Sequence, residues 1–486
     1  MATTHAAPVD ETALIEQRSI DYIPRAERHG KAWHQGTFWF ASNAEIATLA
    51  VGLIGISLGL SLAWSLLAIV VGLAFGTLFM ASHSVQGARL GLPQMIQTRP
   101  QFGFMGALWP QTIVLFLYVG FNVFNLLLAG SALNVLTGIS TDVGIVLAAG
   151  AGLALSYGGY RWLHAVQRWG TAAFLICFGF FTIGMLVSVD IPDGPAKSGP
   201  FDLTAFLIVV FACASYVISE APYVSDYSRY LRPSTSSRAC FSWTYAGAAL
   251  GGLWMIGLGA YLLAAFPEAA PAEVIKLGGD AIFDGFGTIA LTLALLMLLP
   301  TVAANMYGGS LTAITMRDSV KRITPTRRLR LVGLVVVGAC SMVLAIVSPD
   351  DFLTDYSNFL TILLYFMVPW TAVNLVDFYV IRNGDYAIAE IFKRNGVYGR
   401  WNWRGLVAYA IGLLVMVPFF STPWYTGPVA DAVDGADLSI FVGLPVAAIL
   451  YWSFARRLDR GEEQRLARSN DDEAAIAAAD RAEAVP

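Results

Sequence analysis

The sequence predicts an all-α membrane protein with about twelve transmembrane helices. Apolar runs of about twenty residues recur along the chain, and each is long enough to cross a hydrocarbon core of about 30 Å as a helix. The chain is 56% hydrophobic and 13% charged, which is about half the charge of a typical soluble domain. Of its 30 Lys and Arg, all but Lys197 and Lys276 fall on one side of the predicted membrane.

The predicted spans follow one another along the chain, and their boundaries are the ends of the apolar runs. In order they cover residues 36–56, 62–82, 107–135, 142–160, 169–189, 203–224, 243–266, 286–316, 331–348, 355–378, 405–421 and 438–455. Because Lys and Arg gather in cytoplasmic loops, the one-sided charge predicts that both termini are cytoplasmic. We expect a multi-pass protein of the cell's inner (plasma) membrane, in contact with the lipid bilayer.

The spans divide the chain into four expected parts. Residues 1–35 form a cytoplasmic segment without the apolar core and cleavage site of a secretory signal. Residues 36–378 form a ten-helix transport core, and residues 379–455 add a cytoplasmic loop and two further helices. The tail 456–486 mixes Arg, Glu, Asp and Ala, which predicts a solvated, partly helical extension. The loop that contains Phe102 is expected to lie as a strap on the inner membrane face.

Polar side chains enter the first and sixth spans. The first span contains Ser42, Asn43 and Glu45, and the sixth contains Glu220 followed closely by Pro222. Proline disfavours helix at the residue before it, so a helix break is expected there. Two interrupted helices that stand five spans apart predict a 5+5 inverted repeat with two extra helices, and with binding sites at the breaks. Alternatively, the two glutamates pair with amides or hydroxyls and lock helices together.

The third and eighth spans supply a second set of candidate binding residues. Phe121 and Asn125 share one helical face, and Asn122 lies between them. A ring beside an amide suits a flat heterocycle, because the ring stacks on it and the amide meets its donors and acceptors. Thr301 and Asn305 likewise share a face of the eighth span. The asparagines could instead form hydrogen bonds that hold helices together.

Several function classes are excluded or disfavoured. The chain lacks the GxxxxGK[ST] loop of ATP-driven systems, and its four cysteines lack metal-binding spacing, so neither cofactor nor metal is expected. No nucleic-acid partner is expected either. A channel would repeat polar residues along a pore, and a membrane enzyme would need a convergent catalytic set. A secondary active transporter, which is not an enzyme, remains.

Three motifs extend this interpretation to a family. They are Gly91-Leu92-Pro93-Gln94-Met95, Ala221-Pro222-Tyr223-Val224-Ser225-Asp226-Tyr227 and Val376-Asp377-Phe378. Over about residues 20–410 the chain resembles the purine-cytosine permease branch of the nucleobase:cation symporter family. The resemblance implies a leucine-transporter-type fold and import of a purine or pyrimidine nucleobase by alternating access. An allantoin, hydantoin or thiamine-type heterocycle remains the alternative substrate.

The resemblance also assigns roles to particular residues. It implies that Phe121 stacks on the substrate, and that Asn125 and Asn305 form hydrogen bonds with it. A second stacking ring is usual in the sixth span of the family, but Val217 stands at that position. The nearest ring is that of Tyr216.

The same resemblance bears on the coupling ion. Sodium-coupled members have two hydroxyl residues where this chain has Leu299 and Pro300. The remaining sodium ligands would be few, namely Thr301 and the main-chain carbonyls of Ala41 and Ala44. Proton coupling is therefore favoured, with Glu45 or Glu220 as the proton site, since burial favours the neutral form of a carboxyl group. Sodium coupling remains the alternative.

Overall fold

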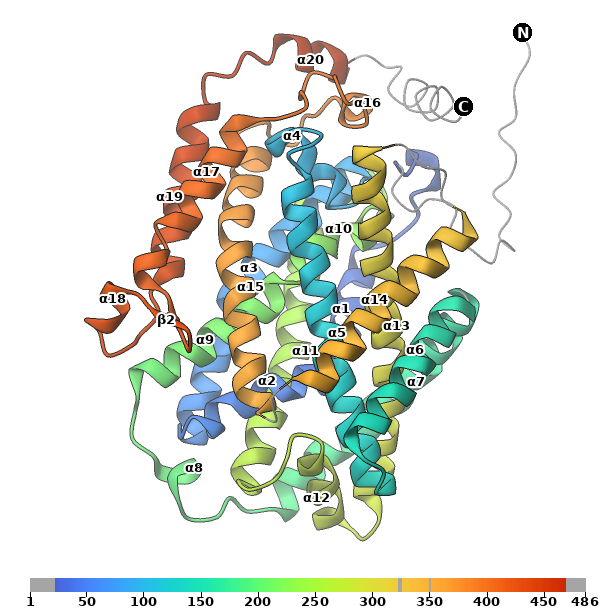
Figure 1. The fold of residues 1–486 in the computed structure, drawn as a ribbon, viewed down its shortest axis with the longest axis vertical. Coiled ribbons are helices and arrows are strands. Elements are labelled where there is room, and N and C mark those ends of the chain that lie inside the picture. Colours follow the sequence, from blue (N-terminus) through green and yellow to red (C-terminus); the bar gives the residue numbers. More distant parts are fainter. Residues whose placement is uncertain (1–21, 159, 322–325, 349–350, 469–486) are drawn as a thin grey trace.

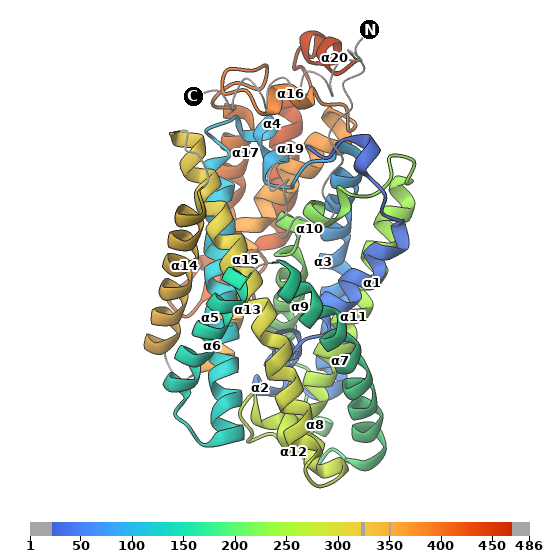
Figure 2. The same ribbon diagram turned by 90° about the vertical axis from the view of Figure 1, so that its right-hand side faces the viewer.

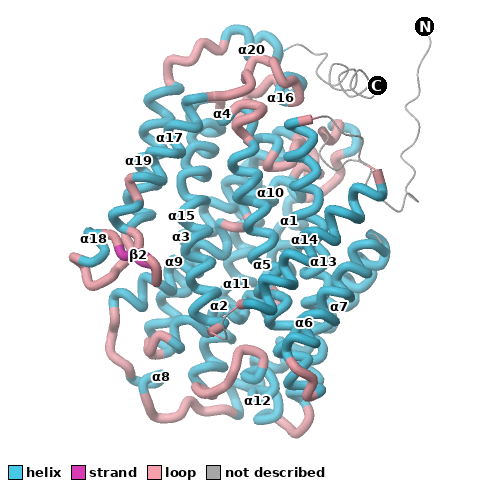
Figure 3. Tube along the Cα trace, viewed as in Figure 1, coloured by secondary structure: helices cyan, strands magenta, loops and turns pink. Residues whose placement is uncertain are grey.

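The computed structural model describes residues 22–158, 160–321, 326–348 and 351–468, without the side chains of residues 158–169 and 327. The described chain is almost entirely helical, with long helices standing side by side (Figures 1 and 3). The long helices and the halves of interrupted ones are α1 Ala32–Asn43, α2 Ile46–Ser57, α3 Leu62–Leu90, α5 Leu108–Thr137, α6 Thr141–Gly158, α7 Tyr160–Ser188, α9 Leu203–Ile218, α10 Ala221–Ser228, α11 Ser237–Ala265, α13 Phe286–Val320, α14 Arg327–Val347, α15 Phe352–Val376, α17 Trp403–Leu414 and α19 Ser439–Ala455.

These helices account for the predicted spans. Among the described residues, eight helices are long and apolar enough to cross a membrane, and the bent pair α1–α2 makes a ninth. Three shorter apolar helices correspond to α6, α17 and α19. Together they give the predicted twelve, so the all-α membrane fold is confirmed.

The two predicted helix breaks differ in kind. Between α1 and α2 the chain bends by 62°, and Glu45 adopts an extended conformation with φ −147° and ψ 164°. The interruption of the sixth span is milder, because Glu220 keeps helical dihedral angles and α10 resumes at the next residue. Pro222 stands in the first turn of α10, where its missing N–H leaves no helical bond unmade. The first span is thus sharply bent at its break, whereas the sixth span continues with helical dihedral angles through its interruption.

The helices form two groups, and one of them contains both interrupted spans. In one group, α11 packs against α1, α2 and α3, and α3 also contacts α9 and α10. Small residues permit this close approach: a Cβ atom on Gly52 of α2 would lie 1.8 Å from the carbonyl oxygen of Ile256 in α11. In the other group, α5 packs against α6, α13 and α14. The facing surfaces of the two groups are where a cavity can form.

Short elements lie mainly at the two ends of the molecule. They are α4 Arg99–Phe102, α8 Pro195–Ser198, α12 Glu273–Ile282, α16 Ile388–Ile391, α18 Pro428–Asp431, α20 Gly461–Arg468, the strands β1 Ser421–Thr422 and β2 Tyr425–Thr426, the 3-10 turns Arg25–Glu27, Ile96–Thr98 and Val417–Phe419, and the π-helical turn Asp377–Ile381. The strands pair antiparallel. Both views place α4, α16 and α20 at one end, and α8 and α12 at the opposite end (Figures 1 and 2).

The loop between the second and third spans is not the membrane-surface strap that we expected. Phe102 is 0% and Arg99 5% exposed, so the segment is packed inside the protein. Its backbone is held by the later connection, because the Phe102 carbonyl accepts from the N–H of Asn402 at 2.8 Å. A contact between segments this far apart in the sequence leaves no trace in local hydropathy.

The tail is helical at α20, as predicted, but one of its charges is not solvated. Glu463 is 6% exposed and accepts a hydrogen bond from the Arg382 guanidinium at 2.8 Å. Arg382 also pairs with Asp377, which is 0% exposed. The Asp377 carboxylate accepts further bonds from Tyr451 and Gln101, both at 2.7 Å. The tail therefore closes a buried ion-pair network at the end of the molecule that contains α4 and α16.

Candidate functional site

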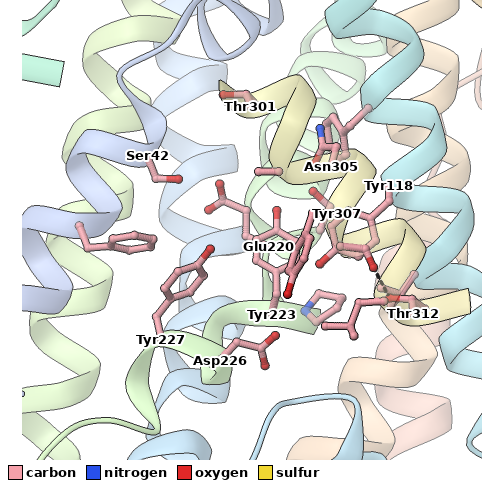
Figure 4. Close-up of a pocket in the computed structure, with 18 of the residues that line it drawn as sticks. Ser42, Tyr118, Glu220, Tyr223, Asp226, Tyr227, Thr301, Asn305, Tyr307 and Thr312 are labelled. Atoms are coloured by element: carbon pink, nitrogen blue, oxygen red, sulfur yellow. Dashed lines mark hydrogen bonds between the residues drawn. The ribbon is translucent and has the colours of Figure 1, made fainter. Parts of the chain in front are cut away.

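A cavity of about 1040 Å³ lies between the interrupted spans and the pair α5–α13. Its inner part is lined by the α1–α2 break, the α9–α10 interruption and polar residues of α5 and α13. At its other end the lining includes His29, Pro93 and Tyr230, which stand in segments that the charge distribution predicts to be cytoplasmic. Figure 4 shows Glu220 between Ser42 on one side and Asn305 and Tyr118 on the other. The cavity thus reaches from the two interruptions toward the predicted cytoplasmic face.

Residues of α5 line the cavity along one helical face. Phe121 and Asn125 both lie on this face, and the Oδ1 atom of Asn125 is buried with no hydrogen-bond partner among the described residues. Asn122 is not in the lining. It is 0% exposed, and neither its amide nitrogen nor its amide oxygen has a partner in the described part of the chain. The two residues that the resemblance singled out therefore face the cavity, and Asn122 does not.

The neighbouring wall, on the same side of the cavity as α5, comes from α13. Pro300, Thr301, Ala304 and Asn305 line the cavity, and Asn305 is partly buried. One turn farther along, Gly308 lies against the ring of Tyr118, since a Cβ atom there would be 2.6 Å from two ring carbons. Glycine at this position lets α5 and α13 approach closely. The predicted polar wall of the eighth span is therefore present.

Glu45 connects the α1–α2 break to α13. The hydroxyl of Thr301 donates a hydrogen bond to a Glu45 carboxylate oxygen at 2.7 Å. Ala41 and Ala44 also line the cavity, but the Ala41 carbonyl already accepts the N–H of Ala44 at 3.2 Å. Two of the oxygens proposed as sodium ligands are thus engaged in hydrogen bonds.

Glu220 is the second carboxylate of the site. It lines the cavity and is 6% exposed, and its Oε2 atom has no hydrogen-bond partner among the described residues. The amide of Asn43 lies beside its carboxyl group, and Glu45 lines the same cavity. Asn43 itself is 0% exposed and does not line the cavity. Its neighbour Ser42 does line the cavity. Both carboxyl groups therefore line the same cavity, with Glu220 buried and Glu45 partly buried.

The sixth span contributes the ring of Tyr216 and not the side chain of Val217. Tyr216 lines the cavity and meets Phe121 edge to face, with ring centroids 6.2 Å apart and planes at 85°. Its hydroxyl lies 2.5 Å from that of Thr48. Val217 is 0% exposed and is absent from the lining. The orientation of α9 about its axis therefore places Tyr216, and not Val217, at the cavity.

The sequence reasoning missed the polar face of α10. Tyr223, Asp226 and Tyr227 of α10 line the cavity and recur at helical spacing, and Tyr118 of α5 faces them. These residues had served only as a family motif. Their spacing of three and four residues was the available signal. Among the described residues no cluster of His, Cys, Asp or Glu could hold a metal ion.

Comparisons with known proteins agree on one family. The family model described as a permease for cytosine/purines, uracil, thiamine and allantoin matches residues 22–443. A putative purine-cytosine permease of Bacillus subtilis, YxlA, is 36% identical, covering 90% of this chain and 95% of its own. The purine-cytosine permease fcyB of Emericella nidulans is 24% identical, covering 90% and 87%.

A solved structure shows the same fold. Mhp1, described as a nucleobase-cation-symport-1 family transporter, was determined in a closed conformation with bromovinylhydantoin bound. It superimposes with a TM-score of 0.73 at 17% identity, over 96% of this chain and 100% of its own. This similarity confirms the fold implied by the resemblance.

Proposed function

Because the chain belongs to the family of permeases for cytosine/purines, uracil, thiamine and allantoin, we propose that it imports a nucleobase, cytosine or a purine, by alternating access. It is a multi-pass membrane transporter and not an enzyme. We place it in the cell's inner (plasma) membrane with both termini cytoplasmic, because that orientation puts nearly all Lys and Arg inside.

One observation carries the substrate proposal. The ring of Phe121, the amides of Asn125 and Asn305, and the carboxyl group of Glu220 all line one cavity beside the helix interruptions. A nucleobase is flat, so a ring can stack on its face. Its edge alternates hydrogen-bond donors and acceptors, which amides can match in both directions. Tyr216, perpendicular to Phe121, would close the site from the other side.

The coupling proposal rests on the two carboxyl groups. Glu45 and Glu220 line the same cavity, and two carboxyl groups facing one partly buried space do not both ionise without an energetic cost. A proton that binds together with substrate removes this cost, and neutralisation also favours closure of the cavity. The hydrogen bond from Thr301 to Glu45 joins the first span to α13. A change in the charge of Glu45 therefore alters a contact between the two helix groups. We propose that a proton binding at Glu45 or Glu220 drives import.

Uptake into proteoliposomes tests both parts of the proposal. Labelled cytosine, adenine, hypoxanthine, allantoin, benzylhydantoin and thiamine are offered separately, under an inward proton gradient or an inward sodium gradient. We expect accumulation of cytosine or a purine under the proton gradient, unaffected by sodium and abolished by a protonophore. Accumulation under the sodium gradient alone would refute proton coupling. Accumulation of only allantoin, a hydantoin or thiamine would refute the assignment of a nucleobase as the substrate.

A further inference from the structure

The cavity lining continues from Phe121, Asn125 and Asn305, which we call the central site, toward the predicted cytoplasmic face. On α5, the lining face continues from Asn125 and Phe121 through Tyr118 and Val114 to Gln111. Gln111 is fourteen residues before Asn125, which corresponds to roughly 21 Å along the helix. One nucleobase cannot span that distance. Groups at the two ends of this face cannot therefore serve a single bound molecule.

Gln111 is a buried amide that faces the cavity and could bind a ligand. It is 1% exposed and lines the cavity, and neither its amide nitrogen nor its amide oxygen has a hydrogen-bond partner among the described residues. A buried amide with no partner is costly and is normally avoided. The buried amide of Gln86 in α3 shows the usual situation, since it donates to Asn374 at 2.7 Å and accepts from Gln94 at 3.0 Å.

Two tyrosine rings stand between Gln111 and the central site. Tyr118 of α5 and Tyr223 of α10 are stacked, with ring centroids 6.0 Å apart and planes at 25°. A flat ring inserted between them needs ring planes about 7 Å apart, twice the contact distance of about 3.5 Å, so the two tyrosines must move apart to admit it. Because helical side chains lean toward the amino terminus of their helix, Tyr118 leans toward Gln111.

The two rings belong to different helix groups. Tyr118 is held against Gly308 on the α5–α13 side, whereas Tyr223 stands on α10, which packs against α3. Asp226 and Tyr227, on the same face of α10 as Tyr223, border this space (Figure 4). Asp226 accepts the backbone N–H of Gln94 at 3.0 Å, and a carboxylate can accept several bonds at once.

We propose that these residues form a second binding site for the transported heterocycle, on its path to the cytoplasm. The base stacks between Tyr118 and Tyr223 and bonds the amide of Gln111. This inference rests on the proposed function, because it assigns the same class of substrate to the second site. A base that leaves Phe121, Asn125 and Asn305 is then held again before release.

Binding stoichiometry tests the inference. Purified full-length protein is titrated with labelled cytosine and with labelled adenine by equilibrium dialysis. We expect about two molecules per chain in a tight class and a weaker class. Asn305→Ala should remove the tight class and leave the weak one. Gln111→Leu should weaken the weak class about tenfold or more and leave the tight Kd within about twofold.

Two further variants complete the test. Tyr223→Leu removes one stacking ring and should also weaken the weak class, by about fivefold or more, which keeps the test available if Gln111→Leu does not fold. Thr112→Val is the matched control, since Thr112 is the exposed neighbour of Gln111 and its hydroxyl donates to the Leu108 carbonyl of its own helix at 2.9 Å.

The outcomes separate this inference from the proposed function. A single class of one molecule per chain in the unmodified protein would overturn the second site and leave the proposed function intact. Weak binding that persists unchanged in both Gln111→Leu and Tyr223→Leu would also overturn it. If neither base binds at all, the proposed substrate is wrong and the second site falls with it.

Discussion

Replacing Glu45 by Gln should abolish concentrative uptake while exchange continues. The glutamine amide keeps the size of the side chain and can still accept the bond that Thr301 donates at 2.7 Å, but it cannot exchange a proton. With one proton per substrate, each pH unit supplies about 1.4 kcal/mol, which corresponds to about tenfold accumulation. The variant should therefore reach an accumulation ratio of about one.

Proteoliposomes with an inward gradient of one pH unit, and with the membrane potential clamped to zero, provide the assay. Counterflow of labelled substrate against unlabelled substrate reports binding and conformational exchange without net proton movement. We expect counterflow in Glu45→Gln within about threefold of the unmodified protein. Tenfold accumulation by the variant would show that Glu45 is not the coupling site.

Thr301→Val tests whether proton coupling needs the hydrogen bond between Thr301 and Glu45 or only the Glu45 carboxyl group. This near-isosteric change removes the donor of the 2.7 Å bond but leaves the carboxyl group. A hydrogen bond to a charged group contributes about 1.5–3 kcal/mol, so transport should become slower by about tenfold or more. The accumulation ratio should nevertheless stay near tenfold, because the proton site remains. A ratio near one in this variant would mean that Thr301 itself is needed for coupling.

The remaining predictions concern substrate binding, the second carboxylate and stability. Asn305→Ala should weaken substrate binding at least about tenfold while expression is unchanged; unchanged affinity would remove α13 from the site. Glu220→Gln should stop uptake or remove its pH dependence, and normal accumulation with normal pH dependence would make Glu220 structural. Arg382→Ala should lower the free energy of unfolding by about 3–5 kcal/mol, because it leaves the buried Asp377 carboxylate without the guanidinium that pairs with it. Lys393→Ala is its control: Lys393 is half exposed in its pair with Glu390, so about 1 kcal/mol or less is expected.

Features that depend on local composition were predictable from the sequence. Each span needs only a sufficient apolar length, so the twelve spans follow from hydropathy without knowledge of their neighbours. The break at Glu45 and the interruption at Glu220 were visible in the same way, because polar residues and a proline interrupt apolar runs. The motifs around Pro93 and Pro222 identified the family, and with it the fold.

Features that depend on helix rotation and on distant contacts were decided only by the tertiary structure. Tyr216 and not Val217 lines the cavity, and Asn122 is not in the lining, because the packing of α9 and α5 selects which helix face is turned inward. The bond from Thr301 to Glu45 and the burial of Glu463 against Arg382 join residues far apart in the chain. The sequence by itself therefore determined which segments cross the membrane and where polar groups interrupt them. Only the folded structure decided which side chains meet, because a hydropathy pattern records the environment of a residue and not its partner.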